Sequence, residues 1–161
     1  MSITAFIKGL TLLLTANGAP VLAGVFADAR TAKPIDGGFR LSDGRPLFGA
    51  AKTWRGLFAA LVATSFVAYL LNYGLLTGIL FAVGAMAGDL LSSFCKRRLG
   101  RAEGSHLRGF DTAPESLLPL LMVKSRLGVG WLEIAILVGV FYVIEEWLSP
   151  VLYKWRLRKQ P

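Results

Sequence analysis

The chain has 161 residues, of which 54% are hydrophobic, and its 18 lysines and arginines outnumber its 10 acids, for a formal net charge of +8. The apolar share exceeds that of ordinary soluble domains and is gathered into long runs, which excludes a soluble globular fold. The cations lie between these runs, where they favour anionic lipid headgroups rather than a nucleic acid. We therefore expect an all-α polytopic membrane protein, with one domain over residues 1–161 and about five transmembrane helices.

The first apolar run spans residues 3–27 and contains Asn17 and Pro20. Residues 27–29 imitate a signal-peptide cleavage site, but no basic region precedes Lys8 and the run is too long for a signal peptide. We expect a retained helix with a break at Pro20, because proline removes a backbone hydrogen bond and frees a carbonyl. Asn17 is then a candidate polar contact in a binding site, with an interhelical hydrogen bond as the alternative.

Residues 28–53 form a polar loop that is long for a simple connector. Six polar residues in it or just after it are candidates for binding a nucleotide triphosphate: Asp36, Asp43, Arg45, Lys52, Thr53 and Arg55. The segment 44–53, GRPLFGAAKT, is not a Walker A box, because two alanines separate its second glycine from the lysine and no strand precedes it. The other cations of the loop, Arg30, Lys33 and Arg40, are expected to be solvated.

Four more apolar segments follow along the chain. The second covers 54–71, and a tight uncharged turn at 72–74 leads into the third, from 74 to about 95, which is long enough to span a bilayer. The fourth, about 114–127, is short and holds a proline and two cations, so both a full and a half crossing fit it. The fifth covers 130–148 and precedes a basic tail.

Basic residues set the expected orientation of these segments. They gather in the loops 28–53 and 96–108 and in the tail 154–159, whereas the amino terminus and the turn 72–74 are nearly free of them. Cytoplasmic segments collect Lys and Arg, so we expect the amino terminus outside, the carboxyl terminus inside, and five crossings of the cell membrane. Only Lys124 and Arg126 oppose this bias. The two polar loops then share the cytoplasmic side, where nucleotides are found.

Asp89 follows a run, 74–88, that contains no charged residue. An ionised aspartate inside a bilayer costs roughly 2.5 to 3.5 kcal/mol, so such an acid is expected to face a cavity, a cation or a substrate. On a helix, Ser93, Lys96 and Arg97 share its face, because they follow it by four, seven and eight residues. This combination suggests a site for a divalent metal ion and phosphate groups. The alternative is a structural ion pair between Asp89 and one of the two cations.

Two further acids, Asp111 and Glu115, precede the fourth segment. They fall on one helix face if Pro114 lies in the first turn of the next helix. For Asp111, capping of that helix is the alternative role. His106 is a lone loop histidine with no expected catalytic role, and the paired glutamates 145–146 are expected near water at a helix end.

Several of these stretches, taken in order, resemble one family. The run from Gly88 to Arg97, GDLLSSFCKR, resembles the G-D-x3-S-x2-K-R core of the phosphatidate cytidylyltransferase superfamily. The other matching stretches are Asn17–Pro20, Pro34–Asp36, Asp43–Arg45, Gly49, Lys52–Gly56 and Gly109–Glu115. The length and the five-segment pattern resemble its small members, the CDP-archaeol synthases. The chain departs from the family pattern at Ala50 and Ala51, at Pro114 where a second aspartate is usual, and in its last helix, which lacks a His-Asn pattern.

The resemblance implies a nucleotidyltransferase that moves the cytidylyl group of CTP to a lipid phosphate such as 2,3-di-O-geranylgeranylglyceryl phosphate, with Mg²⁺. Metal ions held by carboxylates can neutralise the reacting phosphates, so Asp89, Asp111 and Glu115 are the predicted Mg²⁺ ligands. The predicted catalytic residues are Asp89, Lys96 and Asp111. The predicted nucleotide and phosphate contacts are Lys52, Thr53, Arg55, Ser93 and Arg97, together with Asn17 and Asp43.

Three alternatives stay open at this point. One is a phosphatidate cytidylyltransferase that makes CDP-diacylglycerol, and another is a non-enzymatic membrane protein that binds anionic lipids through its basic loops. A CDP-alcohol phosphotransferase is the third, although its D-G-x2-A-R signature is absent. The sequence also leaves open whether the chain forms a homodimer.

Overall fold

A computed structural model describes residues 3–25, 32–102, 105 and 109–154, with only the backbone described for 149–154. This part of the chain folds into helices and contains no strand, only two isolated bridges in the loop after the first helix. The helices are α1 (Ile3–Val25), α2 (Trp54–Leu70), α3 (Leu75–Arg98), α4 (Thr112–Met122), α5 (Lys124–Leu127) and α6 (Trp131–Lys154). The predicted all-α class is confirmed.

Three helix boundaries differ from the sequence-based expectation. α1 runs unbroken from Ile3 to Val25 with Pro20 inside it, so the expected break is wrong. Pro20 instead packs against α2, where a Cβ added to Gly56 would lie 3.3 Å from the proline Cβ. α3 continues to Arg98, and the fourth segment is divided into α4 and α5 at Val123. The cations expected in a loop after the third segment therefore begin on the last turn of a helix.

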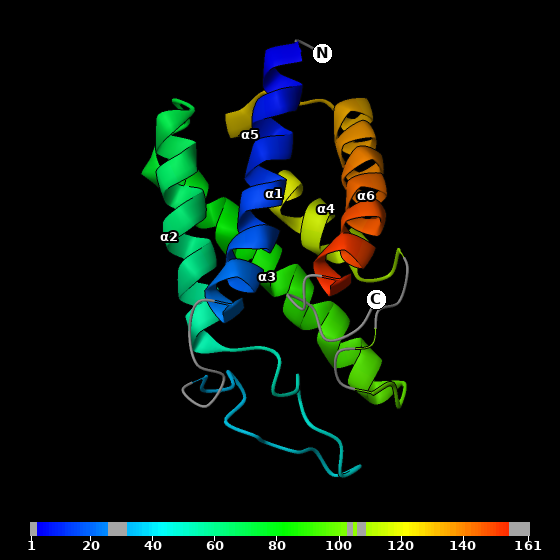
Figure 1. Ribbon diagram of the computed structural model, residues 1–161. Helices are drawn as coiled ribbons and strands as arrows, with labels where there is room; N and C mark the ends of the chain where they lie inside the picture. Colours follow the sequence, from blue (N-terminus) through cyan, green and yellow to red (C-terminus); the bar gives the residue numbers. More distant parts are fainter. Residues whose placement is uncertain (1–2, 26–31, 103–104, 106–108, 155–161) are drawn as a thin grey trace.

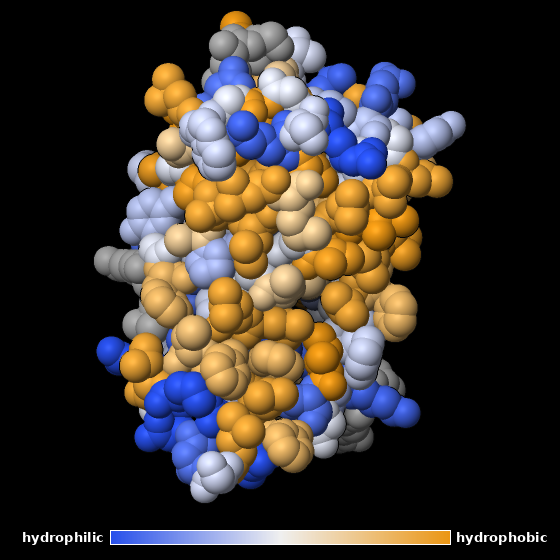
Figure 2. All heavy atoms as spheres, turned by 180° about the vertical axis from the view of Figure 1, so that it is seen from behind, coloured by the Kyte–Doolittle hydropathy of each residue, from blue (hydrophilic) through white to orange (hydrophobic). Residues whose placement is uncertain are grey.

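α2 has two opposite stripes of side chains, each with a spacing of four residues. The buried stripe is small: Gly56, Ala60, Thr64 and Ala68. The exposed stripe is large and apolar: Phe58, Val62, Phe66 and Leu70. A helix of a soluble protein buries its large apolar face, whereas membrane helices pack through small residues and turn large ones to lipid. On the rear face of the molecule, Figure 2 shows a broad hydrophobic band between two hydrophilic ends.

The helices alternate in direction between the two ends of the molecule (Figure 1). α1, α2 and α6 run roughly alongside one another, and α3 crosses them at a slant. The loop 32–53 and the end of α3 lie at one end, and α5 and the start of α1 lie at the other. Within the described residues, α1 and α3 are long and apolar enough to cross a bilayer, and α2 is a shorter apolar helix of 17 residues.

Glycines on α3 let its neighbours approach closely. A Cβ at Gly78 would lie 2.4 Å from the Cα of Ser65 on α2. A Cβ at Gly88 would lie 2.2 Å from the carbonyl oxygen of Pro114 on α4. Neither distance is compatible with a side chain, so both contacts require glycine. Since Gly88 directly precedes Asp89, the second contact brings this acid next to the first turn of α4.

Candidate active site

The loop 32–53 is ordered by the carboxylate of Asp36. Its Oδ2 accepts hydrogen bonds from the backbone N–H groups of Phe48 and Gly49, both at 2.9 Å, and its Oδ1 accepts one from Gly38 at 3.0 Å. Partial burial by itself would raise the pKa of Asp36, but these three donors outweigh it and lower the pKa below its usual value. An ionised Asp36 therefore holds the two halves of the loop together.

The folded loop delivers Lys52 to Asp89 on α3. The backbone N–H of Ile35 donates to the carbonyl of Lys52 at 2.8 Å, which fixes the chain just before α2. Lys52 Nζ then lies 2.6 Å from Oδ1 and 2.7 Å from Oδ2 of Asp89. Both side chains keep about a quarter of their surface exposed, at 23% and 24%. The predicted alternative paired Asp89 with a cation of its own helix, whereas the structure pairs it with Lys52 from the loop.

A second ion pair joins the end of α3 to the start of α4. Lys96 Nζ lies 2.8 Å from Oδ1 of Asp111, and each side chain is only 10% exposed. Lys96 also donates to the carbonyl oxygen of Ser105 at 3.0 Å. The side chain of Asp111 makes no capping hydrogen bond to α4, so capping does not account for its position. Each of the two predicted aspartates thus faces a lysine.

Glu115 completes this cluster from the first turn of α4. It is buried, and its Oε1 has no hydrogen-bond partner among the described residues. Burial by itself would lower the pKa of the Lys52 ammonium, but the charge of Asp89, and then those of Glu115 and Asp111, raise it above its usual value. All three predicted acids are therefore close enough to act on Lys52. We call Lys52, Asp89, Lys96, Asp111 and Glu115 the acid–lysine cluster.

Of the other predicted site residues, some lie on the same face of α3 as Asp89, and the rest lie on other elements. Ser93 and Arg97 are buried on α3, on the face that also carries Asp89. Thr53 is engaged in the fold, since its hydroxyl caps α2 by accepting from the N–H of Gly56 at 3.2 Å. Asn17 donates to the carbonyl of Leu13 in its own helix at 3.0 Å.

Asp43 and Arg55 also lie on elements other than α3. Asp43 pairs with Arg98 at 2.5 Å and accepts from the backbone N–H of Arg45 at 3.0 Å, which attaches the loop tip to the end of α3. Arg55 is half-buried in the first turn of α2. Nucleotide binding by Thr53, Asn17, Asp43 and Arg55 stays a prediction. His106 lies outside the described residues.

Comparison with known proteins identifies the family. The sequence model of a family described as CarS-like, CDP-archaeol synthase, matches residues 2–158. The chain belongs to the CDP-archaeol synthase family. A CDP-archaeol synthase of Methanosphaerula palustris is 37% identical over 138 residues, which cover 75% of this chain and 80% of that protein. One from Saccharolobus islandicus is 31% identical over 134 residues, covering 80% and 81%.

One shorter sequence alignment and one solved structure agree with this family assignment. A CDP-archaeol synthase of Hyperthermus butylicus is 42% identical over 98 residues, which cover 57% of this chain and 55% of that protein. A solved structure of an intramembrane enzyme for archaeal membrane lipid biosynthesis has a TM-score of 0.77 and 28% identity, over 89% of this chain and 91% of that one. The predicted family, the predicted cytidylyltransferase activity and an integral membrane location are confirmed, and the phosphatidate and non-enzymatic alternatives are not favoured.

Glu145 is a residue of this CDP-archaeol synthase family member that sequence reasoning missed. It was expected near water at a helix end, but its Oε2 accepts a hydrogen bond of 2.6 Å from the hydroxyl of Thr112 on α4. Its carboxyl group also interacts with that of Glu115. The signal in the sequence was the departure of the last helix, with its paired glutamates 145–146, from the family pattern.

The donor chemistry of the cluster fits a divalent cation. Asp89, Asp111 and Glu115 offer carboxylate oxygens, the ligands that Mg²⁺ prefers, and Oε1 of Glu115 is buried without a hydrogen bond. The described residues contain no group of three or more His, Cys, Asp or Glu side chains already gathered around one metal position. Two of the carboxylates are instead neutralised by Lys52 and Lys96.

Proposed function

We propose that the acid–lysine cluster is where this CDP-archaeol synthase family member transfers the cytidylyl group of CTP to an archaetidic-acid-type lipid phosphate. An oxygen of the lipid phosphate attacks the α-phosphorus of CTP. The bond from that phosphorus to the oxygen bridging the α- and β-phosphates breaks, and pyrophosphate leaves with the electron pair. The observation that carries this proposal is the placement of two lysine–aspartate pairs, from three separate segments, at one end of α3.

The lysines have a direct role in this reaction. Both substrates are anions, so the site must neutralise phosphate charge and hold the attacking and leaving oxygens in line. Lys52 and Lys96 supply two ammonium groups for phosphate oxygens, and Arg97 offers a guanidinium fork on the same helix. Ser93 would donate a hydroxyl hydrogen bond to a phosphate oxygen. No general base is required, because the second ionisation of a phosphomonoester lies near pH 6.

Asp89, Asp111 and Glu115 would hold Mg²⁺, with Glu145 next to them. A bound Mg²⁺ supplies Lewis-acid stabilisation of the phosphoryl oxygens and of the leaving pyrophosphate. Carboxylates suit this ion better than nitrogen or sulfur ligands do, and Cys95 and His106 are the only sulfhydryl and imidazole of the chain.

An apolar hollow next to the cluster supports a lipid substrate. It has a volume of about 250 Å³ and lies between the start of α4 and the middle of α6, where Thr112 and Ala113 face Val138, Gly139 and Tyr142. Thr112 follows Asp111 directly, so a lipid whose phosphate binds at the cluster can place the first part of its chain in this hollow. Nothing lies within 4 Å of a Cβ built on Gly139, which leaves the hollow open on the α6 side.

Five crossings of the cell membrane complete this proposal. The alternation of helix directions in Figure 1 fits an extracellular amino terminus and a cytoplasmic acid–lysine cluster. CTP then reaches the cluster from the cytoplasm and the lipid phosphate from the bilayer. The cations expected to anchor the tail, Arg156, Arg158 and Lys159, lie outside the described residues, and a homodimer remains a prediction.

The direct test is an assay of the purified full-length protein with labelled CTP and two acceptors, archaetidic acid and phosphatidic acid, side by side. We expect a labelled CDP-lipid with archaetidic acid, faster than with phosphatidic acid, and no product after removal of divalent cations with EDTA. Equal rates with both acceptors would contradict the archaeol preference. No CDP-lipid from either acceptor, with folded protein and Mg²⁺ present, would contradict the proposed reaction.

A further inference from the structure

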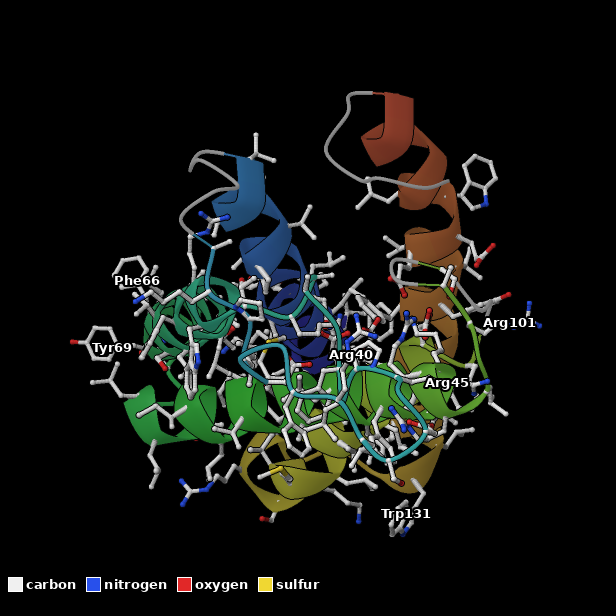
Figure 3. The ribbon with its side chains drawn as sticks, turned by 90° about the horizontal axis from the view of Figure 1, so that it is seen from below. Arg40, Arg45, Phe66, Tyr69, Arg101 and Trp131 are labelled. Atoms are coloured by element: carbon white, nitrogen blue, oxygen red, sulfur yellow. The ribbon has the colours of Figure 1, made fainter. Side chains whose placement is uncertain are left out.

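A second basic region lies beside the acid–lysine cluster, at the end of α3. It is a hollow of about 260 Å³ lined by Arg40, Arg45, Pro46, Arg97, Gly100 and Arg101. Four of these six residues are arginines, and none is an acid. We call it the arginine hollow. In Figure 3, which views the molecule from the loop end, Arg40 and Arg45 lie together over α3 and Arg101 lies at the same end of that helix.

The loop places two of the arginines by forming a small hairpin. Arg40 and Pro46 form an antiparallel bridge, and the backbone N–H of Leu41 donates to the carbonyl of Arg45 at 3.0 Å. This turn brings the side chains of Arg40 and Arg45 from one short segment onto the same hollow. Sequence reasoning treated Arg40 as a solvated loop cation, because it could not foresee this turn.

The arginines of the hollow are held by neutral groups. Arg40 donates to the carbonyl of Gly44 at 2.8 Å, Arg45 to that of Arg98 at 2.6 Å, and Arg97 to that of Ala102 at 2.9 Å. The ion pairs Lys52–Asp89, Lys96–Asp111 and Arg98–Asp43 join described residues, and none of the three includes an arginine of the hollow. Their positive charge is therefore positioned by the fold, and no carboxylate of the described residues forms an ion pair with it.

Capping of α3 explains only part of this arrangement. Arg45 binds carbonyl oxygens in the last turn of α3, and a cation there interacts favourably with the helix dipole. Arg97 is different, because it is 4% exposed and its Nε is buried with no hydrogen-bond partner in the part of the chain that the structure describes. A buried guanidinium N–H without an acceptor is costly, so this group is suited to an anion that enters the hollow.

Gly100 shapes the hollow on its remaining side. It has a positive φ of 73°, and a Cβ there would lie 3.0 Å from Nη2 of Arg45. A larger residue would therefore press on the guanidinium that faces the hollow. The volume of about 260 Å³ far exceeds the roughly 30 Å³ share of one water, so the hollow has room for a group with several oxygens.

We propose that the arginine hollow is a binding site for a phosphate-type dianion that shares no side chain with the acid–lysine cluster, although Arg97 of the hollow directly follows Lys96 of the cluster. Guanidinium groups bind phosphate oxygens through paired N–H donors, and the described lining offers no carboxylate to a metal cation. Arg97 follows Asp89 by eight residues, about 12 Å along a helix. The dianion therefore comes from one of two sources, the diphosphate end of a nucleotide bound at the cluster or the phosphate of a neighbouring membrane lipid.

The test titrates inorganic pyrophosphate into full-length protein in neutral phosphatidylcholine nanodiscs, with EDTA present, by calorimetry. EDTA removes any cation that could bind pyrophosphate at the carboxylates. Arg40→Gln/Arg101→Gln is expected to weaken binding about tenfold, and Arg101→Gln alone by a smaller factor. Lys33→Gln, which removes an exposed cation from the same loop but outside the hollow, is the matched control and is expected to bind as the wild type does.

Nanodiscs that contain phosphatidic acid distinguish the two sources. If a lipid phosphate fills the hollow, pyrophosphate binds the wild type more weakly in these nanodiscs and the difference from the double variant shrinks. If the hollow serves a soluble phosphate, the two lipid mixtures give the same affinities. Equal pyrophosphate affinity of the wild type and the double variant, in both mixtures, would overturn the proposal. A failed CTP assay would leave this result intact, because the titration involves neither CTP nor a divalent cation.

Discussion

The acid–lysine cluster and the arginine hollow lie at the same end of α3, and they differ in what their cations face. In the cluster, Lys52 and Lys96 each face an aspartate at 2.6 to 2.8 Å. In the hollow, Arg40, Arg45 and Arg97 face carbonyl oxygens. In the first region each lysine pairs with an aspartate, and these partners can be exchanged when substrates bind. The second keeps an unbalanced positive charge, which suits it to holding an anion and not to carrying out the reaction.

The largest expected effect comes from removing one charge of the acid–lysine cluster. Asp89→Asn keeps the size of the side chain but removes its charge, so it leaves Lys52 without its ion-pair partner and the cluster with one carboxylate fewer. We expect the rate of CDP-lipid formation to fall by about 10³-fold, as for the loss of one electrostatic group that stabilises a transition state. Labelled-CTP assays at saturating substrates measure this fall.

Glu133→Gln is the matched control for that substitution. Glu133 is an acid at the start of α6 whose Oε2 accepts a hydrogen bond from the backbone of Gly130, at the other end of the molecule. Its replacement is expected to leave the rate unchanged. Asp89→Asn with nearly wild-type activity would show that the cluster is structural, and the comparison of the two regions would then lose its basis.

The next effect tests whether helix packing holds the cluster together. Gly88→Ala places a methyl group against the backbone of Pro114, and relief of this overlap must separate α3 from α4. We expect a loss of stability of about 1–3 kcal/mol and a lower rate, because Asp89 and Asp111 move apart. Thermal unfolding in detergent measures the first, and the CTP assay the second.

Gly24→Ala is the control, because it adds the same methyl group to α1 where nothing lies within 4 Å. It is expected to unfold at or slightly above the wild-type temperature, as alanine favours the helix. If both variants unfold alike, the close approach of α3 and α4 does not determine the cluster.

A smaller effect separates the lipid from the nucleotide. Gly139→Leu fills the apolar hollow from the α6 side, so it is expected to raise the KM for the lipid phosphate about tenfold and to leave the KM for CTP unchanged. Gly24→Leu, at an open position of α1, controls for a large side chain on a membrane helix. An equal rise in both KM values would mean that the substitution disturbs the cluster itself and that the hollow does not bind the lipid chain.

The smallest effect concerns the loop that serves both regions. Asp36→Ala removes the acceptor of three backbone hydrogen bonds, which we expect to loosen the loop 32–53 by about 1–2 kcal/mol and to speed its cleavage by a protease. The pKa of Asp36 is lowered in the folded loop, so its contribution is complete above the usual value of 3.8 and disappears only as the pH falls through the lower folded value. The role of Asp36 would be contradicted if the protease cleaved the wild-type loop no faster after the pH fell below the pKa of Asp36 in the folded loop.

The sequence predicted the helices well and their mutual contacts poorly. The apolar segments and the uncharged run before Asp89 both follow from hydropathy along the chain, which is a local property. The Lys52–Asp89 pair joins residues 37 positions apart, and nothing local indicates it. Asp36 was assigned to nucleotide binding from its type, whereas the structure uses its carboxylate to close the loop.

Two further features were beyond local reasoning for different reasons. Glu145 approaches α4 only because α6 packs beside that short helix, so its hydrogen bond with Thr112 depends on tertiary structure. The arginine hollow needs the hairpin in the loop and the last turn of α3 at once. The unbroken α1 is a different case, since the expected break followed from proline's missing N–H and did not consider its packing on Gly56.

The glycine that precedes Asp89 has a consequence for thermal stabilisation of this protein. Replacing helical glycines by alanine is a common way to raise a melting temperature, since it reduces the freedom of the unfolded chain. That route is open at Gly18 and Gly24 and closed at Gly78 and Gly88, where the neighbouring backbone occupies the space of a methyl group. Engineers who seek a hardier enzyme therefore have to work on the first helix and leave the third alone.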